Sequence, residues 1–114
     1  MTIVERKMEL NEVEQEILRE LVLGLRRDFG ATNVLLYGSA ARGQLDEHSD
    51  IDLLVVLPGL NWDVEKRVIE CCFQAELRCR RVISTACFTP EELADSPLRV
   101  SPFVVSVRKE GIPL

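Results

Sequence analysis

The run from Asp50 to Leu57, which Pro58 and Gly59 end, constrains the fold more than any other feature. It begins with alternating acidic and apolar residues and then becomes continuously apolar. A strand that is apolar on both faces lies inside a sheet and is covered on both sides. A chain of 114 residues supplies one core and has no room for a second catalytic domain. The sequence therefore predicts one α/β domain over residues 1–114, a small mixed β-sheet flanked by helices.

Helical spacing and strand-like runs predict the other elements. Asn11 and Glu14 resemble a capping box that opens a helix ending near Gly30. Further helices are expected from Asn61 or Asp63 to about Arg78, after Thr89-Pro90 and after Ser101-Pro102, where Gly111 ends the last one. The first helix is expected to bury Val13, Ile17, Leu21 and Leu25; strands are expected at Asn33 to Tyr37 and Val82 to Phe88, and a short helix within residues 40–49.

Composition and charge exclude several classes of protein. Fourteen Lys and Arg against nineteen Asp and Glu leave a net charge of −5, which argues against direct binding to nucleic acid or to an anionic membrane. No apolar run approaches the ~20 residues of a membrane helix, and the N-terminus has no apolar signal core, so a cytoplasmic protein is expected. The four cysteines, Cys71, Cys72, Cys79 and Cys87, form no Cys-x-x-Cys pair. They are interpreted as buried or half-buried thiols rather than zinc ligands or disulfides.

The segment between the first two predicted strands carries residues suited to chemistry. Gly38 and Ser39 follow a strand, where a glycine lets backbone amides approach an anion and the serine hydroxyl adds a donor. Asp50 and Asp52 are two residues apart on the next strand, so their carboxylates project from one face. Paired carboxylates repel unless a cation such as Mg²⁺, completed by phosphate oxygens, lies between them. Together these residues predict a nucleoside-triphosphate site for phosphoryl or nucleotidyl transfer.

This pattern, Gly38-Ser39, ten residues, then Asp50-x-Asp52, resembles the signature of the DNA polymerase beta-type nucleotidyltransferase superfamily. The close match covers about residues 34–57 and is most similar to the minimal nucleotidyltransferases, antitoxin-like partners of helical HEPN-domain toxins. The resemblance implies Mg²⁺- or Mn²⁺-dependent transfer of AMP from ATP to a toxin tyrosine. It implies that Asp50 and Asp52 are the catalytic and metal-binding residues. Gly38 and Ser39 would hold the triphosphate, and Arg42 would lie near the nucleotide or stabilise its loop.

One departure from the family pattern affects the expected activity. Active members carry a third carboxylate on the strand after the next helix, where this chain has Ser84 or a neighbour. That acid helps to hold a second metal and activates the attacking hydroxyl. A catalytically silent nucleotide- or protein-binding module therefore remains the alternative. Transfer to a small molecule, as in aminoglycoside nucleotidyltransferases, would require a second substrate-binding domain from a partner chain.

A few other residues are open to more than one interpretation. His48 is expected to be an exposed loop residue rather than a base, and Tyr37 to pack at a strand end, with an acceptor hydroxyl as the alternative. Trp62 is either a core anchor or part of a partner surface. The basic cluster of Arg78, Arg80 and Arg81 is explained by the dipole of the preceding helix at least as well as by phosphate or RNA contact. A homo-oligomer or a HEPN-type partner is expected because the first helix carries a wide apolar stripe.

Overall fold

The computed structural model describes residues 10–46 and 48–114. Its core is a four-stranded sheet in the order β3-β2-β1-β4. The strands are β1 (Asn33–Tyr37), β2 (Ile51–Val56), β3 (Ile83–Phe88) and β4 (Ile112–Pro113). β2 pairs parallel with β3 and antiparallel with β1, and β4 pairs antiparallel with β1. The predicted small mixed sheet is therefore confirmed, with the strongly apolar β2 inside it.

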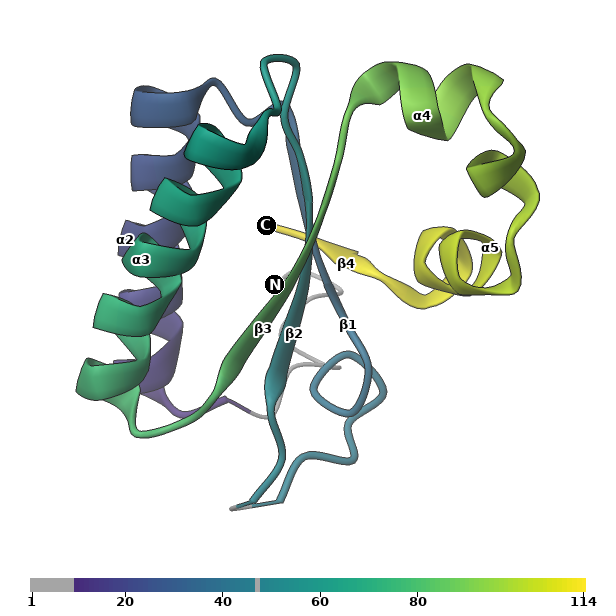
Figure 1. Cartoon of the computed structure of the whole chain (residues 1–114). Coiled ribbons are helices and arrows are strands. Elements are labelled where there is room, and N and C mark those ends of the chain that lie inside the picture. Colours follow the sequence, from purple (N-terminus) through teal and green to yellow (C-terminus); the bar gives the residue numbers. More distant parts are fainter. Residues whose placement is uncertain (1–9, 47) are drawn as a thin grey trace.

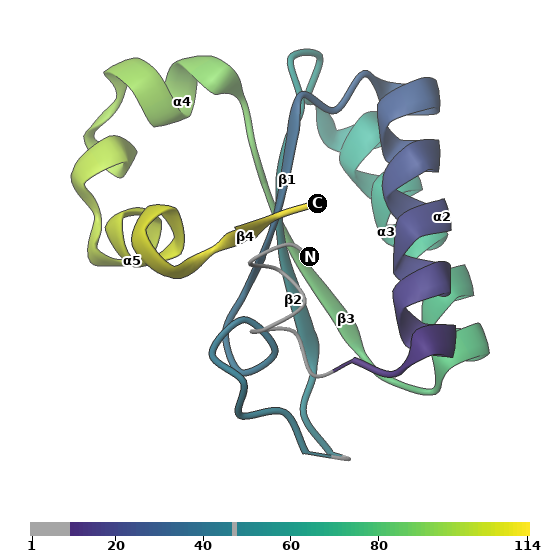
Figure 2. The same ribbon diagram turned by 180° about the vertical axis from the view of Figure 1, so that it is seen from behind.

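Helices cover both faces of this sheet (Figure 1). The long helices α2 (Glu12–Phe29) and α3 (Trp62–Cys79) lie side by side on one face. The short helix α4 (Pro90–Asp95), the 3₁₀ helix η1 (Pro97–Val100) and α5 (Pro102–Glu110) lie on the other, as the reverse view also shows (Figure 2). The elements β2, α3 and β3 thus form a parallel crossover unit, which requires a long connection such as α3.

Apolar packing divides at the sheet into two clusters. The larger cluster lies between the sheet and helices α2 and α3, and it includes Leu53, Val55 and Leu57. The smaller one lies on the opposite face and is formed by Leu54, Val56 and Val107, with Tyr37 and Phe88 packed against it. Alternate residues of β2 therefore enter different clusters, which explains why its sequence is apolar at nearly every position.

The predicted helix starts are confirmed by their hydrogen bonds. The Glu14 amide donates to Asn11 Oδ1 at 2.8 Å, and Glu14 Oε1 accepts from the Asn11 amide at 3.0 Å. Thr89 and Glu92 form the same reciprocal pair at the start of α4. Asn61, rather than Asp63, caps α3 through a bond from the Val64 amide at 2.9 Å. These caps satisfy amides that have no partner inside the first helical turn.

Three expectations about local structure are corrected or decided, and two elements were not expected. Residues 38–43 form consecutive turns, so the short helix expected within residues 40–49 is absent from this part of the described chain. Val13 is 65% exposed because it lies outside the stripe of α2 that faces the sheet. Trp62 is 67% exposed and is not a core anchor. η1 and the two-residue strand β4 were not predicted.

The cysteines behave as expected. All four thiols are free, Cys72 is buried, and the others are half-buried. Burial raises the pKa of the Cys72 thiol to about 12 and that of Cys87 to about 11. At neutral pH these thiols are protonated and pack as small apolar groups.

Across the described residues, none of the helices has the length and apolar character required to cross a membrane. The expectation that the N-terminus lacks a signal core concerns residues that lie outside the described part of the chain.

Candidate functional site

Gly38 makes the turn at the end of β1 possible. Its φ is +73°, in the left-handed region that glycine adopts without steric cost. A Cβ placed at this position would lie inside van der Waals contact with Asp52 Oδ2. The following turn is closed by bonds from Arg42 N to Gly38 O at 3.1 Å and from Gln44 N to Ser39 O at 2.9 Å. The backbone of this turn is therefore held directly against the Asp52 carboxylate.

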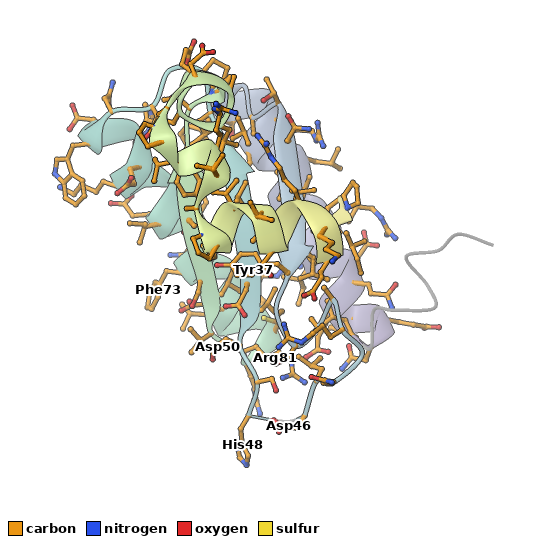
Figure 3. The ribbon with its side chains drawn as sticks, turned by 90° about the vertical axis from the view of Figure 1, so that its right-hand side faces the viewer. Tyr37, Asp46, His48, Asp50, Phe73 and Arg81 are labelled. Carbon is orange, nitrogen blue, oxygen red and sulfur yellow. The ribbon has the colours of Figure 1, made fainter. Side chains whose placement is uncertain are left out.

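Asp50 and Asp52 form a close carboxylate pair at the start of β2. Asp52 has the same strand parity as Leu54 and Val56, so it projects from the face that α5 covers. The pKa of the Asp52 carboxyl is raised, first by burial and then by the negative charge of Asp50. Figure 3 shows Asp50 below α5, between Tyr37 and the loop that carries His48. Two neighbouring acids with this mutual repulsion are arranged to share a cation.

Arg42 and Tyr37 border the same carboxylate. The positive charge of Arg42 opposes the rise in the Asp52 pKa. The Arg42 side chain remains half-exposed, with Nη1 3.8 Å from Glu110 Oε2. Tyr37 is the antiparallel partner of Asp52, and its ring meets that of Phe103 edge to face at 5.3 Å. Burial and the charge of Asp52 raise the pKa of the Tyr37 hydroxyl, which keeps it protonated at neutral pH.

Ser84 lies beside Asp52 on the neighbouring strand. The two residues are register partners in the parallel pair of β2 and β3, so their side chains project from the same face about 4.8 Å apart along the sheet. The next residue, Thr85, is the partner of Leu53 and projects from the opposite face. The structure thus brings Ser84 to the carboxylate pair. Among residues 10–46 and 48–114, no group of three or more His, Cys, Asp and Glu side chains comes together.

The loop that leads into Asp50 is fixed by Arg81, whose contacts differ from the sequence expectation. Arg81 Nη1 donates to the main-chain oxygens of Asp46 at 2.7 Å and Ser49 at 2.8 Å. Its Nε forms an ion pair with Glu14 Oε2 at 2.6 Å, in which both side chains are at least 87% buried. Within the loop, the Asp46 carboxylate accepts bonds from the His48 amide and the Ser49 hydroxyl, which lower its pKa. Arg81 is therefore a positioning residue rather than a phosphate contact or a dipole partner.

Sequence reasoning missed Arg81 because its partners are distant in the chain. Glu14 lies 67 residues from Arg81 in the chain. The sequence indicated only that Glu14 caps α2. The remaining residues of the cluster behave differently: Arg78 lies in the last turn of α3, as the dipole explanation expects, and Arg80 ends that helix with φ +58°. His48 is exposed, as expected.

Replacing Arg81 with lysine is expected to loosen the loop without unfolding the domain. Lysine keeps the charge that Glu14 requires, but it lacks the planar fork that bonds Glu14 and two carbonyls together. Losing about 1–2 kcal/mol of bonding should speed hydrogen exchange at amides 46–51 about tenfold. Exchange measured by mass spectrometry checks this, with Arg78→Lys, on an exposed ion pair to Glu20, as the control. Equal protection of the loop in both variants would contradict the role of Arg81.

The chemistry of the donor set fits a hard divalent cation. Asp50 and Asp52 offer carboxylate oxygens, the ligands that Mg²⁺ prefers, and the absence of a side chain at Gly38 lets the Asp52 carboxylate lie directly against the turn. Burial raises the pKa of Asp52 first and the charge of Asp50 adds to the rise, so a bound cation would relieve the second of these effects. Asp50 and Asp52 are thus the residues that would hold Mg²⁺ or Mn²⁺.

Asp52→Asn is expected to stabilise the metal-free protein at pH 7. The folded-state pKa of Asp52 is raised, so the fold disfavours the charged form that predominates at neutral pH. The variant should melt roughly 1–4 °C higher than wild type in EDTA. The difference should shrink as the pH falls through the folded-state pKa and disappear below the unfolded one, where wild-type Asp52 is also neutral. Calorimetry from pH 7 to pH 3 measures the difference in Tm. An equal or lower Tm of the variant at pH 7 would contradict the view that burial and the charge of Asp50 disfavour ionised Asp52.

The antiparallel β1–β2 pair, the glycine turn after β1 and the two carboxylates at the start of β2 lie together at one end of the sheet. A family model described as "Nucleotidyltransferase domain" matches residues 18–101, and the chain belongs to this family. No curated protein matches the sequence of this chain.

Two solved structures share the fold. One, a toxin–antitoxin structure with AMP-PNP, is 19% identical with a TM-score of 0.56; the alignment covers 82% of this chain and 69% of that one. The other, a mutant of the toxin–antitoxin MntA-HpeT, is 20% identical with a TM-score of 0.58, covering 93% and 72%. At this level of identity, the likeness establishes a common fold.

Proposed function

We propose that the protein transfers AMP from ATP to a hydroxyl group of another protein, as the antitoxin of a HEPN-type toxin. The observation that carries the proposal is the contact geometry of Gly38 and Asp52: a side-chain-free turn lies directly against one of two paired carboxylates. Membership of the nucleotidyltransferase family supports the reaction class. The toxin–antitoxin neighbours, one of them with AMP-PNP, support the choice of nucleotide and partner.

In the proposed reaction, the acceptor oxygen forms a bond to the α-phosphorus of ATP, and the bond from that phosphorus to the bridging oxygen of the β-phosphate breaks. Pyrophosphate leaves, and the hydroxyl proton passes to a base. The turn at Gly38 and Ser39 holds the triphosphate, and Arg42 lies beside it. Asp50 and Asp52 would hold Mg²⁺ or Mn²⁺, which would neutralise phosphate charge.

A second candidate function is a nucleotide- or protein-binding module without catalysis. Its support is the position of Ser84, which lies in register with Asp52 where the resemblance calls for a third carboxylate. A serine hydroxyl is a poor base at neutral pH, so the acceptor proton has no carboxylate to receive it at this position. Such a module would neutralise its partner by covering its surface.

Nucleotide binding should depend on a divalent cation. Wild-type protein is expected to bind ATP measurably with Mg²⁺ or Mn²⁺ and to lose this binding in EDTA, because the carboxylate pair and the triphosphate repel each other. Asp50→Asn with Asp52→Asn should abolish the metal dependence. Isothermal titration calorimetry measures both. The matched control is Asp63→Asn with Asp95→Asn, which removes the same charge from exposed or helix-terminal sites.

Equal Mg²⁺-dependent affinity in the two double variants would contradict the site assignment. Mass spectrometry of the co-expressed toxin then separates the candidate functions. Added AMP on that protein supports transfer, whereas an unmodified toxin in a stable complex supports occlusion.

A further inference from the structure

Tyr37 is the one tyrosine of the chain, and it lies where the two parts of the candidate site meet. It is the last residue of β1, directly before the turn at Gly38 and Ser39. It is also the antiparallel register partner of Asp52, and facing residues of such a pair have Cβ atoms about 4.5–5.5 Å apart on one face of the sheet. In Figure 3 Tyr37 lies beneath α5 and above Asp50. The phenol therefore projects from the sheet beside the carboxylates.

The Tyr37 hydroxyl makes no hydrogen bond to any of residues 10–46 and 48–114. Burial and then the charge of Asp52 raise the pKa of this phenol, yet the Asp52 carboxylate does not accept a bond from it. In the same part of the chain every buried side-chain oxygen and nitrogen has a partner, so this unbonded hydroxyl is accessible to solvent. Because the phenol is protonated at neutral pH, the site contains a hydrogen-bond donor that the protein itself does not use.

Phe103 holds the ring that carries this hydroxyl. Phe103 is the second residue of α5, and its ring lies edge to face with that of Tyr37, with 5.3 Å between the centroids and 83° between the planes. The Phe103 ring also lies 6.3 Å from that of Phe88, at the end of β3. Edge-to-face rings at this distance attract each other beyond the effect of the area they bury. Contacts with α5 therefore fix the phenol before any ligand binds, as a binding group requires.

We propose that the Tyr37 hydroxyl donates a hydrogen bond to a phosphate oxygen of the bound nucleoside triphosphate. The inference rests on the proposed function and adds one contact to the same site. The turn that would hold the triphosphate begins at the next residue, so a phosphate against Gly38 and Ser39 lies next to this donor. Ionised phosphate oxygens are strong acceptors, and a neutral phenol donates to them without adding negative charge beside Asp52.

Tyr37→Phe tests the contact because it removes only the hydroxyl oxygen and keeps the ring against Phe103. The variant should bind Mg²⁺–ATP about five- to tenfold more weakly than wild type, the usual contribution of one hydrogen bond. Its affinity for Mg²⁺–tripolyphosphate, which lacks the nucleoside, should fall by the same factor. Isothermal titration calorimetry measures both. Thr32→Val is the matched control, because it removes an exposed hydroxyl at the opposite end of β1 and should change neither affinity.

Phe103→Leu tests whether α5 positions the phenol. Without the edge-to-face contact, Mg²⁺–ATP binding should weaken about two- to threefold in the wild-type background. In the Tyr37→Phe background the same substitution should have no further effect, because the hydroxyl that Phe103 orients is already absent. Equal losses in the two backgrounds would overturn this positioning role.

NMR can observe this hydroxyl directly because the chain has a single tyrosine. Protein labelled with ¹³C at the tyrosine Cζ, the carbon that carries the hydroxyl, gives one signal. Its chemical shift should move when Mg²⁺–tripolyphosphate is added, by more than it moves with Mg²⁺ alone. A signal that responds equally to both additions would contradict a bond from Tyr37 to phosphate.

The binding results separate failure of this contact from failure of the proposed function. If wild type binds Mg²⁺–ATP and Tyr37→Phe binds it equally well, the contact alone is overturned. A loss for ATP without a loss for tripolyphosphate would overturn the assignment to phosphate, and an equal loss in Thr32→Val would overturn the specific role of Tyr37. A wild type that binds neither ligand would overturn the proposed function and this contact with it.

Discussion

Ser84→Asp is expected to raise the rate of AMP transfer about 10²–10⁴-fold, the usual contribution of a positioned general base. Ser84 is the register partner of Asp52, so an aspartate there places a third carboxylate beside the existing pair. The wild type should bind nucleotide but transfer AMP slowly, because it has no carboxylate at this position to take the acceptor proton. Transfer of radiolabel from α-³²P-labelled ATP to the co-purified partner measures the rate.

Two variants control this experiment. Ser84→Asn has nearly the size of aspartate without its charge and should not increase transfer. Thr85→Asp adds the same charge on the opposite face of the sheet, beside Leu53, and should not help either. Rapid transfer by the wild type would mean that a carboxylate elsewhere, such as Glu91, Glu92 or one from the partner, completes the site. The interpretation of Ser84 as a catalytic deficit would then be wrong.

Gly38→Val is expected to lower the affinity for Mg²⁺–ATP at least about tenfold. A β-branched residue at φ +73° is strained by about 1–3 kcal/mol, and its Cβ would overlap Asp52 Oδ2. Either the turn or the Asp52 carboxylate must move, and both belong to the proposed site for Mg²⁺–ATP. Calorimetry measures the affinity, and circular dichroism shows whether the fold survives.

Gly59→Val is the matched control for this loss. A Cβ at Gly59 meets no atom within 4 Å, so the same substitution there should leave ATP binding unchanged. A folded Gly38→Val protein with wild-type affinity would rule out the turn as the phosphate cradle.

Elements that are specified locally could be predicted from the sequence. The caps at Asn11 and Thr89 depend on side chains three residues away, and both formed as expected. β1 was predicted with its observed bounds because five consecutive residues of strand type end at a glycine turn. The place of Ser84 beside Asp52 was expected from the family resemblance alone, as Ser84 or a neighbour, because the register between β2 and β3 depends on the long α3 crossover between them.

Features that depend on distant partners could not be predicted. β4 contains Pro113 and pairs through Ile112 with Leu36, so only the position of β1 makes it a strand. Residues 38–43 contain helix-favouring Ala40 and Ala41, but the positive φ of Gly38 and Gly43 and the burial of both alanines hold the segment in turns. Arg81 carries no local signal for a bond to Glu14. The roles of Gly38, Ser39, Arg42, Asp50 and Asp52 in binding and catalysis stay predictions.

The way in which Arg81 holds the loop before Asp50 affects which sequence changes that loop can tolerate. Two of its bonds end on main-chain oxygens, which every residue possesses, and the third ends on Glu14 in another element. A substitution in the loop therefore leaves the main-chain acceptors of Arg81 in place, although exchange of Asp46 or Ser49 would remove bonds within the loop. The loop surface next to the carboxylates can thus acquire new residues while Asp50 and Asp52 keep their positions. Libraries randomised at His48 should accordingly retain ATP binding much more often than libraries randomised at Arg81.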